Sequence, residues 1–548
     1  MPSSAHPIVR THRRAPSRRR RGLLAAGVSI VAAVAGVSVG LPFASAATTI
    51  AYDTGSGLTF VINSTNGNIT SLRHDGVELA SPGQAAGQFE SGWKSATVTG
   101  KTFGDGTILV TAANASVGVT MYYVARKNDN TVYVATDITK ALNPGEARFI
   151  SRLNSRLLST SPVAARTGGS VAAVEGSDVF RFTDGTTASK FYSSQRLIAQ
   201  QPFGASGGGH GVFLIGGTHE MSSGGPFFRD IEVNDTGTTV NITHYMFSGH
   251  EQTEALRLGL HGPYAMAVTD GGRPAARSMD FLSAYIPGLL SNAQRGGVSG
   301  TAGGSWAGRP GTVALAGPNG QYWGSVKAGR FVIGHIRPGA YTATLYAGEL
   351  AVGATEVLTV TAGATTTLAM SGDVPAAGTL FQLGAFDGTP AGFRNADKIE
   401  TMHPSDPRMS SWTPGTVAVG SGAAALPMAE FKSVNSPLAL SFPLAAVPAT
   451  GVRLRIATTG AFAGGRPAVS IGGFTSAASA SPAPANLNSR GVTRGTWRGI
   501  TVTYTFTIPA SALKAGANTL SISVLSGSSG AAFLSPNFVF DALALDPA

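Results

Sequence analysis

Short stretches of alternating hydrophobic and polar residues run through most of the chain. Residues 58–76, 131–140 and 501–508 either alternate in this way or are rich in β-branched residues, which predicts half-buried strands. The best helix candidate is SMDFLSAYIPGLL at 278–290, and Pro287 should end it. Amphipathic helices are otherwise hard to find in the sequence. We therefore predict an all-β protein that is built from several sandwiches.

Two glycine- or proline-containing stretches divide the predicted strands into three groups. VSGTAGG at 298–304 leads into a compact run of strands, and SGDVPAAGT at 371–379 is typical of a linker. We predict a large first domain at 47–292, a small second domain at 293–372 and a last domain at 373–548.

The first 46 residues have the composition of a secretory leader. Seven arginines and no acidic residue precede an apolar run at 23–41, which closes on the cleavage signal Ala44-Ser45-Ala46. The arginine cluster at 17–24 also fits a twin-arginine export signal. The alternative is an uncleaved membrane anchor, because the apolar run is long enough to span a bilayer. We expect cleavage, and hence a secreted, extracellular protein without a membrane partner.

The leader also changes what the charge of the chain means. The formal net charge is +11, and seven of these charges are the arginines of the leader. The rest of the chain is only weakly basic, so a nucleic-acid partner loses most of its support. The chain contains no cysteine, which excludes disulfides and thiolate chemistry. Hydrophobic cores must therefore stabilise the domains. As a separate expectation, the protein is a monomer.

Histidines are concentrated in one window of the predicted first domain. Histidine is the usual acid or base near neutral pH, so this window is a candidate site; the alternative is a set of surface or strand histidines. His250 stands out because Glu251 and Glu254 follow it closely, and one of them could orient the imidazole. The window contains His210, His219, His244, His250 and His261.

Two arginines form a second candidate feature. Arg148 and Arg152 are four residues apart in a predicted strand, so they should point to the same face. Two guanidinium groups on one face can receive a carboxylate or a phosphate. The alternative is a solvated strand face.

Metal sites have little support in the sequence. H-E-x-x-H does not occur, and the spacing of His244 and His250 alone is a weak signal, so we expect no metal or other cofactor for catalysis. Asn537 and Asp541 near the C-terminus could ligate a structural calcium ion. Three aromatic residues of the last domain could either stack on sugar rings or belong to its core: Trp412, Trp497 and Tyr504.

A series of motifs in chain order resembles the rhamnogalacturonan endolyases, which form polysaccharide lyase family 4. The likeness continues through IRPGAYTATLYAGELAV at 336–352 and several motifs of the last domain, so it covers essentially the whole chain after the leader. The motifs of the first domain are RFISRLNS (148–155), EGSDVF (175–180), SKFYSS (189–194), SSGGPFFRDI (222–231), SGHEQTE (248–254) and LRLGLHGPY (256–264).

The resemblance implies a fold and an activity. The expected architecture is a large β-supersandwich of the galactose mutarotase kind, a small immunoglobulin- or fibronectin-like sandwich, and a jelly-roll that resembles carbohydrate-binding modules. The family cleaves the alternating rhamnose–galacturonate backbone of rhamnogalacturonan I, a pectin, by β-elimination. Its catalytic pair corresponds to Lys190 in SKFYSS and His250 in SGHEQTE.

The chemistry of β-elimination explains why these residue types are needed. The C5 proton of galacturonate becomes acidic enough only when a cation neutralises the neighbouring carboxylate, and Arg148 and Arg152 are expected to do so. A base must remove that proton, and an acid can protonate the leaving O4. We assign Lys190 as base and His250 as the partner acid or alternative base, and the sequence leaves this choice open. Possible groove residues are Tyr245, His261 and Tyr264.

Two other functions remain as alternatives. A non-catalytic polysaccharide-binding protein could use the same scaffold, although a complete set of catalytic residues argues against it. A glycoside hydrolase would need two carboxylates that face one bond, and no acid stands in a motif comparable with those of Lys190 and His250.

Overall fold

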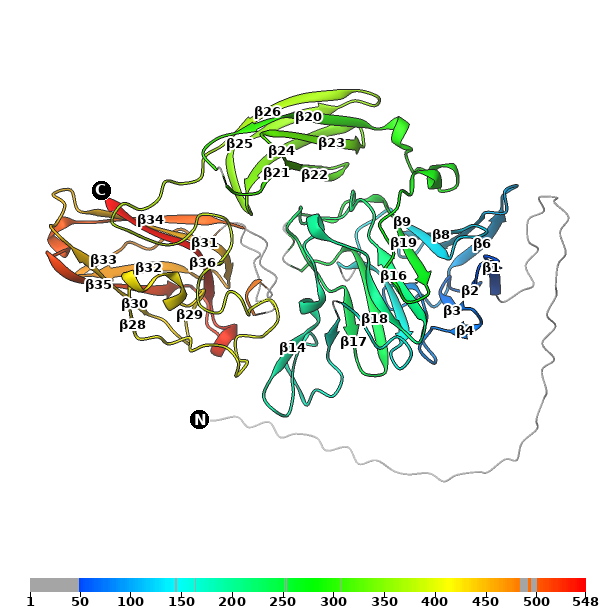
Figure 1. Ribbon diagram of the computed structural model, residues 1–548, viewed down its shortest axis with the longest axis horizontal. Coiled ribbons are helices and arrows are strands. Elements are labelled where there is room, and N and C mark those ends of the chain that lie inside the picture. The colour runs from blue at the N-terminus through cyan, green and yellow to red at the C-terminus, as the bar shows by residue number, and fades with distance from the viewer. Residues whose placement is uncertain are drawn as a thin grey trace, which may run out of the picture. The chain divides into compact units, whose positions relative to one another are not determined.

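The computed structural model describes residues 49–142, 145–162, 164–250, 252, 254–306, 308–482, 491–493 and 500–548. The predicted leader, Glu251 and Trp497 lie outside these residues. Nearly all regular structure in the described chain is strand, which confirms the all-β class (Figure 1). In this part of the chain, every helix is too short to cross a membrane.

Strands β1 to β19 form four sheets. A four-stranded sheet contains β1 (Thr49–Asp53), β2 (Leu58–Asn63), β3 (Ile69–His74) and β4 (Val77–Glu78). The order of a seven-stranded sheet is β15 (Phe203–Gly207), β16 (His210–Ile215), β19 (Gly259–Thr269), β9 (Thr131–Ile138), β8 (Val119–Ala125), β7 (Ile108–Asn114) and β6 (Thr97–Thr102). The order of a five-stranded sheet is β11 (Ala165–Arg166), β17 (Val233–Asp235), β18 (Thr239–Phe247), β10 (Ala147–Asn154) and β5 (Gln88–Phe89). A three-stranded sheet contains β12 (Ala172–Glu175), β13 (Val179–Arg181) and β14 (Thr187–Ser189).

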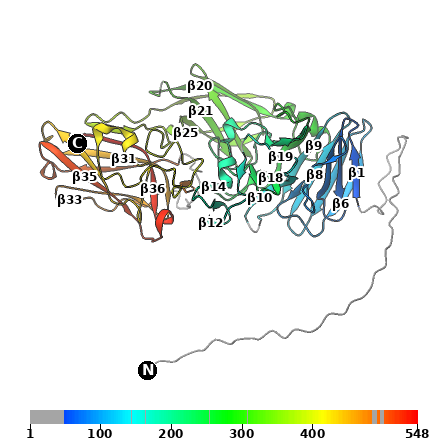
Figure 2. The same ribbon diagram turned by 60° about the horizontal axis from the view of Figure 1, so that its bottom comes forward.

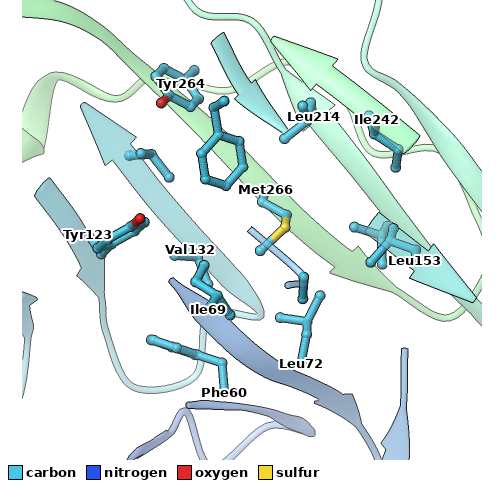
Figure 3. Packing of buried hydrophobic residues seen from close by; sticks show 14 of the residues in the cluster. Phe60, Ile69, Leu72, Tyr123, Val132, Leu153, Leu214, Ile242, Tyr264 and Met266 are labelled. Atoms are coloured by element: carbon cyan, nitrogen blue, oxygen red, sulfur yellow. The ribbon is translucent and has the colours of Figure 1, made fainter. Parts of the chain in front are cut away.

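The inner faces of the larger sheets share one hydrophobic core. Figure 3 shows Phe60 and Leu72 of the four-stranded sheet, Met266 of the seven-stranded sheet and Leu153 and Ile242 of the five-stranded sheet, all buried in it. Successive side chains of a strand point to opposite faces of its sheet, so every second residue points inward. The other face of the five-stranded sheet is therefore free to carry polar side chains.

The predicted helix at 278–290 is only partly present. The segment forms a short 3₁₀ helix, η3 (Asp280–Ala284), and the chain turns at Gly288 with a positive φ of 78°. Its apolar residues Met279, Leu282 and Ile286 pack on the outer face of the seven-stranded sheet. Their helical spacing therefore reflects the packing of single short turns against the sheet, and Pro287 prevents a longer helix.

Strands β20 to β26 form a small sandwich with its own core. One sheet has the order β23 (Arg330–Ile336), β20 (Gly296–Gly303) and β26 (Thr365–Ser371). The other has the order β22 (Gly320–Val326), β21 (Gly311–Gly317), β24 (Gly339–Ala347) and β25 (Leu350–Val360). Val313, Phe331 and Tyr341 are among the buried residues between them. The remaining short helices before this sandwich are η1 (Lys190–Ser193), η2 (Leu197–Ala199) and η4 (Asn292–Gln294).

Strands β27 to β36 form a second, larger sandwich. One sheet has the order β27 (Phe381–Gly384), β36 (Asn537–Pro547), β31 (Val452–Phe462) and β34 (Val502–Ile508), and β29 (Ala429–Phe431) also pairs with β36. The other has the order β28 (Thr416–Ala418), β30 (Leu438–Leu444), β35 (Gly516–Leu525), β32 (Arg466–Ile471) and β33 (Phe474–Thr475). Its short helices are η5 (Val419–Ser421), η6 (Ala423–Ala425), η8 (Ala510–Ala512) and η9 (Ala532–Leu534). Trp412 and Tyr504 lie in its core, so they are core residues rather than exposed sugar platforms.

Candidate active site

His250 lies just beyond the end of β18, in a turn that fixes its position. The Gln252 side-chain oxygen accepts hydrogen bonds from the backbone of Ser248 and Gly249, at 3.0 and 2.9 Å. The imidazole is buried, and its Nδ1 lies 3.1 and 3.0 Å from the two carboxylate oxygens of Asp230. A carboxylate only accepts hydrogen bonds, so Nδ1 carries a hydrogen and Nε2 is the atom left for proton transfer.

Lys190 begins the 3₁₀ helix η1, directly after β14. The Ser189 hydroxyl caps this helix by accepting a hydrogen bond from the Phe191 N–H at 3.2 Å. The Lys190 Nζ lies 3.6 Å from Oδ1 of Asp178, and its side chain is 27% exposed, so solvent or substrate can reach the amine. The buried Phe191 ring packs edge-on against the His250 ring with 5.2 Å between centroids. Lys190 and His250 therefore belong to neighbouring segments of one site.

Arg229 connects the segments that carry these two residues. Its guanidinium donates to the Phe191 carbonyl at 3.0 Å and to the Ser194 hydroxyl at 2.9 Å, both in or next to η1. It also forms an ion pair with Glu400 at 2.7 Å, and only 3% of its side chain is exposed. Because Arg229 precedes Asp230 in the chain, it ties η1 to the carboxylate that orients His250.

Arg148 of β10 lies opposite Tyr245 of β18. The two strands pair in the five-stranded sheet, and Figure 2 labels both of them. Its Nη1 donates to the Tyr245 hydroxyl at 2.9 Å and lies 3.3 Å from Glu146 Oε2, while Nε lies 3.2 Å from Glu90 Oε2. Burial opposes its charge, but Tyr245, Glu90 and Glu146 outweigh burial and raise the pKa of Arg148. Glu146 also lies 3.6 Å from Nε2 of His250, so it brings the guanidinium and the imidazole together.

Burial strongly affects two partners of Arg148. It raises the pKa of Glu90 to about 7, although the positive charge of Arg148 acts in the opposite direction. Burial, followed by the negative charge of Asp230, also raises the pKa of Tyr245, which keeps the phenol neutral. Glu90 therefore exchanges a proton near neutral pH, which makes the charge around Arg148 sensitive to pH.

Arg152 points to the same face of β10 as Arg148, as its spacing predicts. It lines an open cleft of about 750 Å³ with polar residues that include Gln84, Gln88 and Asn154. Burial and the nearby charge of Arg148 lower the pKa of Arg152. Four strand residues span about 13 Å between Cα atoms, and the binding of one carboxylate by both guanidinium groups stays a prediction.

Two predicted groove residues are instead part of the core. Tyr264 is fully buried and shares a hydrogen bond of 3.0 Å with Thr136, and His261 is 1% exposed with Nε2 bonded to the Arg257 carbonyl. Burial lowers the pKa of His261 to about 4, which keeps the imidazole neutral. The prediction that these two residues line the groove is therefore wrong. Both are on β19, a central strand whose two faces are covered.

The other histidines of the window are also not in the site. His244 is buried and stacks on Tyr264 with 4.2 Å between ring centroids, and His219 lies beside it. Burial lowers the pKa of both imidazoles. The clustering of histidines along the chain is therefore mainly a property of packing, and the site contains only His250 of this set.

The carboxylate that orients His250 is not one of those predicted. Glu251 lies outside the described residues, and Asp230 rather than Glu254 contacts Nδ1. Sequence reasoning also missed Glu90 and Glu146. Asp230 lies in SSGGPFFRDI directly after Arg229, and Glu146 lies two residues before Arg148, the first residue of RFISRLNS. An acid close to a motif arginine was therefore the signal that could have identified both carboxylates.

The predicted calcium ligands of the last domain are fully buried. Oδ1 of Asp541 accepts hydrogen bonds from three consecutive backbone N–H groups at 387–389, and burial raises the pKa of Asp541 to about 7. Among the described residues, Oδ2 of Asp541 and Oδ1 of Asn537 have no hydrogen-bond partner. Such oxygens suit a hard cation, and calcium at this place stays a prediction.

Comparison with known proteins shows the family of the chain. The family model described as rhamnogalacturonan lyase B, N-terminal, matches residues 43–286. The models for domains II and III of polysaccharide lyase family 4 match 294–368 and 379–545.

Curated relatives agree with the family models. Rhamnogalacturonate lyase A of Aspergillus aculeatus is 43% identical over 94% of this chain and 98% of its own length. The protein of the same name from Emericella nidulans is 43% identical over 94% and 97%. A putative rhamnogalacturonase of Neurospora crassa is 43% identical over 93% and 96%. With these matches over almost its whole length, the chain belongs to polysaccharide lyase family 4 and is a polysaccharide lyase.

Proposed function

We propose that the protein is a secreted endolyase that cleaves the rhamnose–galacturonate backbone of rhamnogalacturonan I by β-elimination. Relatives that share 43% identity carry the name rhamnogalacturonate lyase, which supports the substrate class. The leader-like N-terminus supports export. The protein acts as a monomer and uses side chains rather than a metal ion for the chemical step.

The proposed reaction begins when Arg148 neutralises the galacturonate carboxylate. Lys190 is the base that removes the C5 proton, and the electrons of the C5–H bond form the C4=C5 double bond. The bond between C4 and O4 of galacturonate breaks, and His250 Nε2 supplies the proton that this departing glycosidic oxygen requires to become the anomeric hydroxyl of the leaving rhamnose. The new non-reducing end is a 4,5-unsaturated galacturonate. Asp178 stabilises the Lys190 ammonium that forms, and Asp230 stabilises the charged imidazole before it gives up its proton.

One observation carries the proposal: Glu146 contacts both Arg148 and His250, which supports charge neutralisation and proton transfer in one place. The Phe191 ring packs on the same imidazole, which supports a role for the neighbouring Lys190 in this site. The polar cleft next to Arg152 lies on the same sheet face and offers room for further sugar units of a long substrate.

Substitution of Lys190 and His250 tests the mechanism. Lys190→Ala and His250→Ala should each abolish the ultraviolet absorbance that a conjugated unsaturated uronate produces from rhamnogalacturonan I. Lys101→Ala, an exposed lysine on β6, is the matched control and should keep full activity. Lys190→Ala with parental elimination activity would refute the assignment of the base.

The same assay separates the alternative functions. Only elimination produces the unsaturated product, whereas hydrolysis raises reducing ends without that absorbance. A hydrolase would have to use acids such as Glu90 and Glu146. Binding of the polysaccharide without either signal would identify a non-catalytic binding protein. For export, sequencing the N-terminus of the secreted protein should show that the mature chain begins after Ala46.

A further inference from the structure

A second cluster of ligand-type side chains lies outside the proposed active site. His74 ends β3 of the four-stranded sheet and Asp75 starts the turn to β4, whereas Asp270 follows β19 of the seven-stranded sheet. His74 Nε2 lies 3.5 Å from Asp270 Oδ1 and 3.9 Å from Asp75 Oδ2. In the described chain, these three residues form the one group of histidine and acidic side chains whose ligand atoms all lie within 4.8 Å.

The buried histidine is what distinguishes this cluster from a set of surface acids. His74 is only 2% exposed, whereas the side chains of Asp75 and Asp270 are 66% and 93% exposed. Its Nδ1 lies 3.0 Å from Nδ1 of His210, so one hydrogen must lie between these two nitrogens. When His74 donates that hydrogen, its Nε2 presents a lone pair towards two carboxylates. Three acceptor atoms then converge on one point, where a cation can bind.

The backbone around the cluster leaves space for the carboxylate of Asp75. A Cβ atom at Gly57 would lie 2.6 Å from Asp75 Oδ1, and the φ of Gly57 is +111°, a conformation that favours glycine. The Asp75 N–H also donates to the Gly57 carbonyl at 2.9 Å. The loop that contains Gly57 therefore holds Asp75 beside His74.

We propose that His74, Asp75 and Asp270 bind one divalent transition-metal ion of the zinc type. One imidazole nitrogen and two carboxylate oxygens are ligands that zinc accepts, and water can complete the coordination. Bonds of about 2.0–2.2 Å in tetrahedral geometry place ligand atoms about 3.3–3.6 Å apart. The pair of His74 and Asp270 has this spacing, and a small rotation of the exposed Asp75 side chain brings its oxygen into range.

The proposed ion would join two sheets at the ends of two of their strands, β3 and β19. His74 and Asp75 belong to the four-stranded sheet, while Asp270 and the supporting His210 belong to the seven-stranded sheet. The chain has no cysteine and hence no disulfide to make such a link. Since a metal that binds only the folded state stabilises it, the ion would act as a structural clasp.

The experiment uses the chelator-treated protein without a histidine tag, titrated calorimetrically with zinc chloride. We expect one saturable site per chain, and zinc should raise the midpoint of thermal unfolding. Asp270→Ala and Asp75→Asn should each weaken zinc binding by at least about tenfold, because each removes a charged ligand. Both positions are exposed, so neither variant should impair folding. Asp53→Ala, an exposed acid of β1, is the matched control and should bind zinc as the parent does.

Two further measurements locate the site. His210→Phe should lower zinc affinity by about 10- to 100-fold, since partners that orient a metal-binding histidine have effects of this size. His250→Ala should leave zinc affinity unchanged, because its imidazole belongs to the other site. The proposal is overturned if the parent shows no saturable zinc binding, or if Asp270→Ala and Asp75→Asn bind zinc with parental affinity. Calcium binding at the cluster in place of zinc would also overturn it.

Discussion

Asp230→Asn tests whether the carboxylate behind His250 contributes to catalysis. The side chain of Asp230 is 5% exposed, and both of its oxygens lie within 3.1 Å of His250 Nδ1. With roughly 4 Å between the charges of Asp230 and an imidazolium, and an effective dielectric constant of about 20, their attraction is about 4 kcal/mol. Asparagine keeps the shape and one acceptor oxygen but removes the charge.

We expect this substitution to remove about 2–4 kcal/mol of stabilisation from the charged imidazole. That loss lowers the population of the charged imidazole, the proton donor of the proposed step, by about 30- to 1,000-fold, and kcat should fall with it. KM should change little, because Asp230 is buried behind the imidazole and does not face the polar cleft.

The assay follows the unsaturated product on rhamnogalacturonan I at saturating substrate. Asp235→Asn is the matched control, since the carboxylate of Asp235 accepts a hydrogen bond from Gly237 and does not touch His250. Circular dichroism and thermal unfolding should show that both variants fold as the parent does. If Asp230→Asn keeps more than half of the parental kcat, the charge of Asp230 does not support proton transfer by His250, and our reasoning about the pair is refuted.

Two further predictions concern buried charges. Glu400→Gln removes the carboxylate partner of Arg229, so it should lower the free energy of unfolding by about 1.5–3 kcal/mol. It should also reduce kcat, because Arg229 holds η1 in place. Urea unfolding and the elimination assay measure both effects, and Glu356→Gln, an exposed glutamate of β25, should change neither. Burial raises the pKa of Glu430 in the folded protein well above its usual value of 4.5. Glu430 therefore stabilises the fold fully below pH 4.5, and this contribution is lost as the pH rises towards the raised pKa. Glu430→Gln should therefore flatten the pH dependence of urea unfolding above pH 4.5, and an unchanged dependence would contradict this account.

The positions of the main strands could be predicted because alternation is a local signal. Residues 131–140 and 501–508 contain β9 (Thr131–Ile138) and β34 (Val502–Ile508) as expected. The same signal places Arg148 and Arg152 on one face of β10. The motifs around Lys190 and His250 likewise identified the family, because they lie in the same order along the chain as in its members.

Only the tertiary structure decided which side chains meet. Alternation assigns a residue to one of two faces, but it does not say whether the strand is central and has both faces covered. His261 and Tyr264 are on such a central strand, so they are in the core rather than in the groove. Pairing of β10 with β5 and β18 brings acids from separate segments to Arg148 and His250. The approach of β3 to the end of β19 likewise places Asp270 beside His74. Such contacts depend on strand order and register, which are set by the packing of whole sheets and not by any local pattern.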